Sequence, residues 1–304
     1  PIFLGLEWLA DYVVGDGDGK FVVLRYFAAF FYGVAVLVLS RKAKGRWYGT
    51  VLLSTSMMAL AITVLEFFFY VVVNMGMKGS AVRHEITTEP TFSKFTHEDS
   101  LLGYSLSSSA ATYEVLYVND SSQKTAKYSV DQEAKRFTCA GNISSSDQQF
   151  ACFLGCSFTF GTLVNDCETM PSFFAANDTD YVVYNFGVPG YGSHQQLPLI
   201  RSGRLRKKLK GESGVFVYTF LDHHVRRNIG DQFVLDTNPF AACSPFFELS
   251  EDSLKSEGSF KVARKALTCT YELLNLSYTL RYFGIRFPLF ESEAHWQLTA
   301  ALIN

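Results

Sequence analysis

Two long apolar stretches dominate the first quarter of this 304-residue chain. Residues 21 to 40 are apolar apart from Arg25 and small or hydroxyl-bearing side chains, and residues 50 to 75 carry a single charge, Glu66. At a rise of about 1.5 Å per residue, each stretch is long enough to cross a hydrocarbon core of roughly 30 Å. The pattern predicts a transmembrane helical hairpin over residues 21–75.

The segment 41–49 between the two stretches is basic and carries aromatic residues. It contains Arg41, Lys42, Lys44 and Arg46, with Trp47 and Tyr48 beside them. The flanks of the hairpin are less basic, so the positive-inside rule places this segment in the cytoplasm. We therefore expect residues 1–20 and everything after residue 75 to be periplasmic, extracellular or luminal. A cleavable signal peptide fits badly, because the first stretch is followed by a basic loop and not by a small-residue cleavage site.

A different pattern begins at about residue 147. Apolar runs at 150–154, 181–186 and 215–220 each end in glycine or polar residues, and Ser193 opens a helical stretch between the last two. Alternating strands and helices are typical of a parallel sheet flanked by helices, whose ligands sit at the carboxyl ends of the strands. The pattern predicts an α/β domain over 147–304, with the polar strand ends gathered on one edge.

The first of these strands ends in Gly155-Cys156-Ser157, which delivers a serine to a turn. A serine becomes a nucleophile when a histidine accepts its proton, and the oxyanion that forms next needs preorganised N–H donors. Ser157 is the candidate nucleophile, and the amides near Cys156 and Gly190 are candidate donors. The alternative is an ordinary structural Gly-x-Ser turn.

This part of the chain resembles the SGNH (GDSL-like) hydrolases, which are serine esterases and acetyl-transfer enzymes with a flavodoxin-like three-layer fold. Two blocks carry the resemblance: Gly155-Cys156-Ser157, which is similar to the nucleophile block, and Asn185-x-Gly187-x-x-Gly190, which is similar to the second block. The resemblance covers about half of the chain. It implies that Ser157 is the nucleophile and that Gly190 offers an oxyanion-hole amide.

The chain departs from the family pattern in three places. Cys156 replaces an aspartate of the nucleophile block, and Asp222-His223 stands where the third block, Gly-x-Asn-Asp, has its asparagine. Asp222 is therefore a further oxyanion candidate. The family's Asp-x-x-His, which supplies the base, does not occur after Ser157, so the base candidates within the chain are His223, His224 and His295. Because the final residues read as a helix still in progress, we expect the chain to be incomplete at its C-terminus.

Residues 76–146 are polar and lie between the hairpin and the α/β domain. The run 112–118 alternates as a strand does and ends in a turn signal. We expect a small β-rich collar packed on the main domain. The alternative is a plain linker.

All six cysteines follow the hairpin, as expected for a domain in an oxidising compartment. Six cysteines allow fifteen connectivities. We prefer the pair Cys243–Cys269, because these two residues flank one polar insertion. Since no Cys-x-x-Cys spacing or phosphate loop is present, we expect neither a metal nor a cofactor. A net charge of −2 gives no indication of nucleic-acid binding.

Two functions fit the sequence. The first is a membrane-anchored, extracytoplasmic serine esterase or O-acyl transferase acting on cell-surface glycans, lipids or other esters. The second is a catalytically inactive SGNH-like subunit of a larger membrane complex. Glu66 bears on the second function, because a carboxylate within a membrane span needs a partner. That partner is either Arg25 or a polar group of another transmembrane subunit.

Overall fold

The computed structural model describes residues 20–42, 47–75, 87–89, 95–108, 112–118, 123–139, 149–237, 240–250 and 253–304. The chain divides into two compact units. One contains residues up to Val82 together with Ser277–Ile285, and the other contains Arg83–Leu276 and Arg286–Asn304. We call them the helical unit and the α/β unit.

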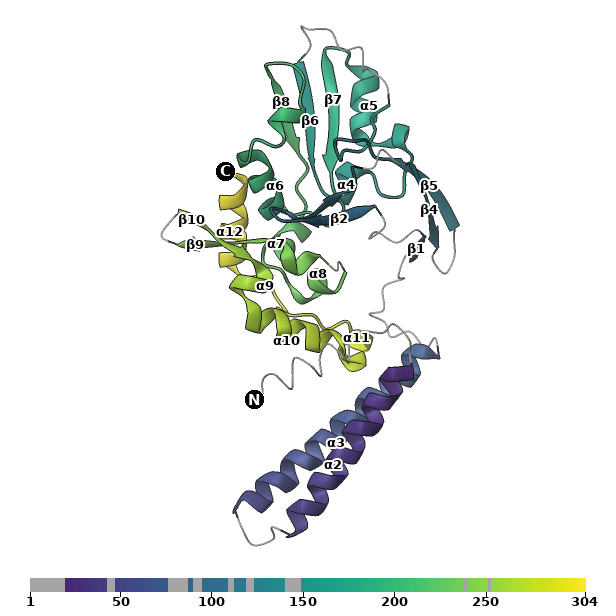
Figure 1. The fold of residues 1–304 in the computed structure, drawn as a ribbon, viewed down its shortest axis with the longest axis vertical. Coiled ribbons are helices and arrows are strands. Elements are labelled where there is room, and N and C mark those ends of the chain that lie inside the picture. The colour runs from purple at the N-terminus through teal and green to yellow at the C-terminus, as the bar shows by residue number, and fades with distance from the viewer. Residues whose placement is uncertain are drawn as a thin grey trace. The chain divides into compact units, whose positions relative to one another are not determined.

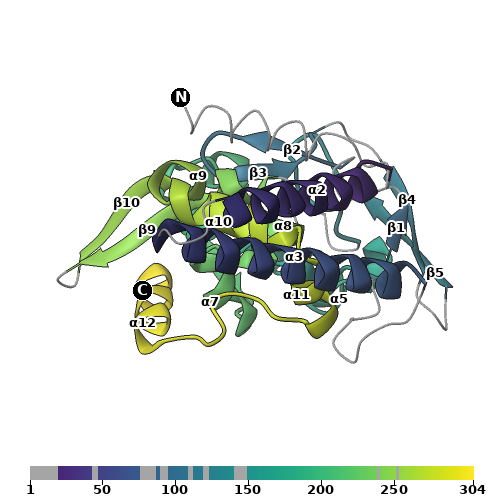
Figure 2. The same ribbon diagram turned by 90° about the horizontal axis from the view of Figure 1, so that it is seen from below.

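The helical unit is built on α2 (Lys20–Lys42) and α3 (Trp47–Asn74), which lie side by side along their lengths (Figures 1 and 2). Among the described residues, one helix is long and apolar enough to cross a membrane, Trp47–Val73 within α3. The expectation of an apolar helix at 50–75 is therefore confirmed. A second span at 21–40 is not shown, although α2 occupies that stretch and begins and ends with cations.

A third helix of this unit, α11 (Tyr278–Phe283), packs against α3 through aromatic rings. Phe69 contacts Tyr282 with ring centroids 4.6 Å apart, and Tyr70 meets Tyr278 edge to face at 5.1 Å. Such aromatic pairs add stability beyond the area that they bury.

Glu66 joins the same two helices. Its carboxylate accepts a hydrogen bond from Ser277 Oγ at 2.6 Å and another from the backbone N–H of Tyr278 at 2.8 Å. The partner expected for Glu66 is thus supplied by a distant segment of the same chain. The Arg25 side chain lies outside the described residues.

The α/β unit contains a parallel sheet of three strands, β6 (Gln149–Gly155), β7 (Tyr181–Gly187) and β8 (Gly214–Tyr218), in the order β7-β6-β8 (Figure 1). The expectation of an α/β fold with a parallel sheet is confirmed. The register pairs Gly155 with Gly187 and Leu154 with Tyr218, so the three carboxyl ends lie at one edge.

β6 and β7 are buried along almost their whole lengths, which explains why these two strands are almost continuously apolar, whereas the edge strand β8 leaves Val215 and Phe216 exposed. Successive β6 side chains alternate between two clusters: Cys152 and Leu154 pack with Leu205 and Leu209, whereas Ala151 and Phe153 pack with Ala175. The helices that follow the first two strands are α4 (Ser157–Phe160), α5 (Met170–Asn177) and α6 (Ser193–Arg201).

The remaining elements complete the unit. The strands are β1 (Thr87–Glu89), β2 (Thr96–Asp99), β3 (Gly103–Leu106), β4 (Thr112–Val118), β5 (Gln123–Ser129), β9 (Pro245–Ser250) and β10 (Ser253–Ser259). The α-helices are α7 (His223–Asn228), α8 (Gln232–Thr237), α9 (Phe260–Ala263), α10 (Lys265–Asn275) and α12 (Glu293–Ile303). Short 3-10 helices are η2 (Asp166–Glu168), η3 (Arg206–Lys208) and η4 (Ala241–Cys243).

The polar stretch before the α/β sheet carries strands that belong to the same compact unit. β4 coincides with the strand expected at 112–118 and pairs with β1 and β5, while β2 pairs with β3. Buried residues from β2–β3 and β5 form one apolar cluster with Phe160 of α4 and Tyr191. This β-rich segment therefore packs on the turn that follows β6.

The buried side chain of Arg136 fixes that packing. Nothing in the sequence pattern indicated this role. Its side chain is 0% exposed and donates to the carbonyls of Phe160, Gly161 and Val164 at 2.6, 2.6 and 2.7 Å. It also pairs with Asp166 at 3.2 Å. Because a buried charge is tolerated only when it is paired and hydrogen-bonded, Arg136 holds the segment after α4 in one conformation.

A disulfide lies close by in sequence, between Cys139 and Cys167. The predicted pair Cys243–Cys269 is wrong, because both of these thiols are free. Cys269 is exposed on α10, and Cys243 is half-buried in η4. Cys139 pairs with Cys167 because the ion pair between Arg136 and Asp166 brings the segments before these two cysteines together. A disulfide agrees with an oxidising compartment.

Candidate functional site

Ser157 is the first residue of α4 and stands directly beyond the end of β6. The turn depends on Gly155, whose φ of +150° is one that other residues rarely adopt. A Cβ at Gly155 would lie 2.3 Å from Thr159 Oγ1, so the close approach also requires glycine. Ser157 is half-buried, and its Oγ lies 4.0 Å from Sγ of the buried Cys156.

The ends of β7 and β8 meet this turn. The carbonyl of Gly155 accepts hydrogen bonds from the backbone N–H of Val188 and from Gln196 Nε2, both at 3.1 Å. The N–H of Thr219, which follows β8, donates to Leu154. Polar segments from three strands therefore converge at one edge, as expected from their parallel order.

Asn185 shows what the Asn-x-Gly spacing does in this fold. Its Nδ2 donates to the carbonyl of Thr159 at 3.0 Å, and its Oδ1 accepts from the N–H of Gly187 at 3.0 Å. The side chain is completely buried. Asn185 therefore clamps α4 to the end of β7 and holds the turn that carries Ser157.

The three candidate bases have different surroundings. His223 is exposed at the start of α7. His224 is buried, and its Nδ1 shares a hydrogen bond with Tyr218 OH at 2.7 Å; burial, then the nearby Arg227, lowers its pKa to about 3. His295 belongs to α12, where its Nδ1 accepts from the N–H of Ser292 and so caps the helix. Thus His224 and His295 have structural partners.

His194 is a functional candidate that the sequence reasoning missed. Its ring Nδ1 and its backbone N–H lie 2.9 and 3.1 Å from Asn228 Oδ1, and Asn228 Nδ2 donates to Thr299. This arrangement assigns the proton to Nδ1 and leaves Nε2 with a lone pair. Burial lowers the pKa of His194 to about 4, so the ring is neutral at pH 7. The only sequence signal was its position directly after Ser193, which was expected to open a helix and is the first residue of α6.

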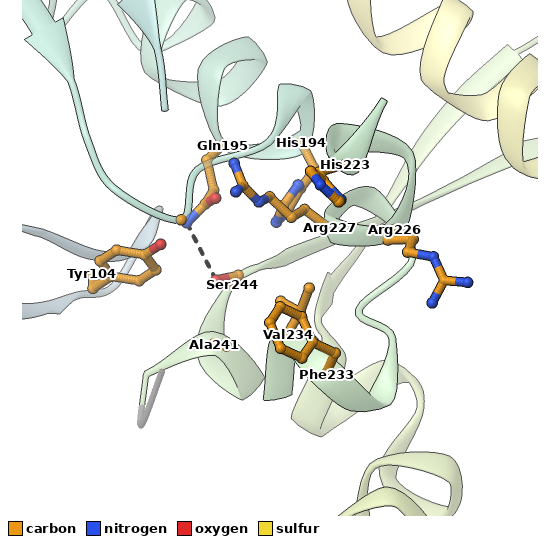
Figure 3. Close-up of a pocket in the computed structure, with 11 residues that line it drawn as sticks. Tyr104, His194, Gln195, His223, Arg226, Arg227, Phe233, Val234, Ala241 and Ser244 are labelled. Atoms are coloured by element: carbon orange, nitrogen blue, oxygen red, sulfur yellow. Dashed lines mark hydrogen bonds between the residues drawn. The ribbon is translucent and has the colours of Figure 1, made fainter. Parts of the chain in front are cut away.

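A pocket of about 270 Å³ lies beside the starts of α6 and α7 (Figure 3). Its lining comprises the basic and polar residues His194, Gln195, His223, Arg226, Arg227, Tyr104 and Ser244, and Gly190, Phe233, Val234 and Ala241. Two predicted site residues, Gly190 and His223, thus share one pocket. Ser157, Asp222 and His295 are not among its lining residues.

Metal binding receives no support from the part of the chain that is described, where no three His, Cys, Asp or Glu side chains are placed to hold an ion. No protein-family model matches the sequence, and no curated protein is significantly similar to it. The SGNH resemblance therefore stays a prediction, and function has to be argued from the site.

Proposed function

We propose that the α/β unit is an SGNH-like serine esterase or O-acyl transferase with Ser157 as its nucleophile. The observation that carries this proposal is the turn after β6. A glycine with positive φ and the Asn185 clamp present Ser157 at the carboxyl edge of a parallel sheet. Ligands of open α/β sheets bind at this edge.

The chemistry follows from the groups at that edge. Ser157 Oγ attacks the carbonyl carbon of an ester while a histidine accepts its proton, and the developing oxyanion is bound by backbone N–H groups. The alcohol leaves with the proton that the histidine returns. Water then releases the acyl group as an acid, or an acceptor hydroxyl takes it in the transferase reaction.

The assignments of the remaining roles are part of the same proposal. Gly190 supplies an oxyanion amide, and His223 is the base candidate because it lines the same pocket as Gly190. Cys156 and Asp222 are the other oxyanion candidates. The acyl donor is an ester of a cell-surface glycan or lipid.

In this proposal the protein is anchored by two spans, α2 and α3, with the α/β unit outside the cytoplasm. From Trp47 to Glu66 helix α3 rises about 29 Å, close to the ~30 Å of a hydrocarbon core. Glu66 then lies at the outer boundary of the hydrocarbon, where the polar start of α11 satisfies it. The disulfide Cys139–Cys167 supports this compartment.

The test is labelling of the full chain with a fluorophosphonate probe, which reacts with activated serines. Wild-type protein should be labelled, Ser157→Ala should not, and the exposed Ser202→Ala is the matched control that should be labelled as wild type. Equal labelling of Ser157→Ala would remove Ser157 as the nucleophile.

The alternative is an inactive SGNH-like subunit of a membrane complex, with other transmembrane subunits as partners. One observation favours it: two of the three predicted base candidates, His224 and His295, are engaged in structural hydrogen bonds. The same experiment separates the two functions. A folded wild-type protein that is not labelled, and that purifies with other membrane proteins in mild detergent, supports the scaffold.

A further inference from the structure

The two adjacent arginines of α7 have very different partners. Arg226 is paired with Asp231 at 2.9 Å and with Glu291 at 3.1 Å, so its charge is compensated. Arg227 donates through Nη1 to the backbone carbonyl of Tyr191 at 2.8 Å. Among the residues that the structure describes, no carboxylate is paired with Arg227.

The free edge of Arg227 has a specific shape. Since Nη1 is occupied by Tyr191, the Nε–H and Nη2–H groups remain, and within the described chain neither has a recorded acceptor. These two donors form a planar fork that matches the two oxygens of a carboxylate. Figure 3 shows the Arg227 side chain running toward Gln195, whereas Arg226 points away from it.

The positive charge of Arg227 acts on the interior of the unit. After burial, it is the next cause that lowers the pKa of His224, and it also lowers the pKa of His194. Among the described residues that line the pocket, none is an aspartate or a glutamate. The pocket therefore has one cationic wall without a built-in counter-ion.

The rest of the pocket suits a small amphiphilic ligand. Phe233, Val234 and Ala241 form an apolar wall, and Ser244 Oγ, which accepts from Gln195 Nε2 at 3.3 Å, keeps its own proton for donation. Ligand pockets usually measure about 300–1,000 Å³, so this one fits a molecule of only a few carbon atoms.

We propose that this pocket binds the carboxylate of a small organic acid, with Nε and Nη2 of Arg227 donating to its two oxygens. The short hydrocarbon part of the acid packs against Phe233 and Val234. Inorganic phosphate fits less well, because it would place a strongly hydrated charge against the apolar wall. The binding site stands whether or not Ser157 is a nucleophile.

The test is isothermal titration calorimetry of the full chain in detergent with three probes: sodium butyrate, butyramide and inorganic phosphate. Butyramide has nearly the shape of butyrate without its charge. We expect butyrate to bind at least tenfold more tightly than either of the other probes. Arg227→Gln should weaken butyrate binding at least tenfold, and Arg227→Lys, which keeps the charge but loses the fork, should weaken it less.

Two controls keep the test decisive. Arg201→Gln, at the exposed end of α6, should bind butyrate as wild type does, and so should Ser157→Ala, which separates this proposal from the proposed catalysis. If Arg227→Gln does not fold, the wild-type protein alone decides, since butyrate should raise its unfolding temperature and butyramide should not. Equal binding of butyrate and butyramide, unchanged binding in a folded Arg227→Gln, or tighter binding of phosphate would overturn the proposal.

Discussion

Replacement of the buried Arg136 by methionine should destabilise the α/β unit strongly. Methionine fills much of the same volume but leaves the carbonyls of Phe160, Gly161 and Val164 without the guanidinium, and Asp166 without its cation. Breaking a buried ion pair by removing one partner costs about 3–5 kcal/mol. We expect a loss in the free energy of unfolding of that order, and a disordered turn after Ser157.

The unfolding of this unit can be measured through its buried thiols. Cys152 and Cys156 are both 0% exposed, so alkylation of these two residues during a urea titration of the full chain reports on the α/β unit alone. Arg201→Met, at an exposed position, is the control and should change stability by less than about 0.5 kcal/mol. A decrease below about 1 kcal/mol for Arg136→Met would show that the carbonyls find other donors and would refute this reasoning.

Three further predictions concern other parts of the chain. Glu66→Leu should release α11, so that trypsin cleaves faster after Arg281, whereas Val64→Leu at an exposed position of α3 should not; an unchanged rate would contradict the capping role of Glu66. Reduction of Cys139–Cys167 should lower the stability of the α/β unit by about 3 kcal/mol, and non-reducing mass spectrometry should find Cys243 and Cys269 free. His194 has a folded-state pKa of about 4, below its unfolded value of 6.5, so the unfolded chain binds the extra proton. Stability is therefore full above pH 6.5 and falls between pH 6.5 and 4, and a flat profile over that range would refute burial of a neutral ring.

The parts of the fold that follow from local pattern could be predicted from the sequence. The apolar runs that became β6, β7 and β8 are short, end in glycine or polar residues and alternate with helical stretches, so they specify a parallel sheet with little outside help. The same holds for Ser157, because the glycines that shape its turn are adjacent in the chain. The apolar stretch of α3 is equally local.

The groups that complete the site could not be predicted, because their roles depend on distant partners. Arg136 lies in a polar stretch that resembles a linker, and only the folded chain places it under Phe160. Glu66 finds Ser277, 211 residues away. Arg226 and Arg227 look equivalent in the sequence, and what distinguishes them is that Asp231 and Glu291 reach only the first.

The two blocks that resemble the SGNH family account for the structure of the turn after β6. By themselves they do not distinguish an enzyme from an inactive scaffold. Nδ2 of Asn185 holds α4 and its Oδ1 fixes the end of β7, and both contacts would be needed in an enzyme and in an inactive scaffold alike. Ser157 is different, since the only recorded contact of its Oγ within the described chain is 4.0 Å from Cys156 Sγ. Its hydroxyl contributes little to the fold.

Two variants therefore distinguish the functions. Asn185→Ala leaves the Thr159 carbonyl and the Gly187 N–H buried without their partner, which should cost about 2–3 kcal/mol in either case. Ser157→Ala should change the free energy of unfolding by less than about 0.5 kcal/mol and, in an enzyme, abolish ester turnover. If Ser157→Ala were as destabilising as Asn185→Ala, the serine would be a structural member of the turn, and the resemblance would carry no information about activity.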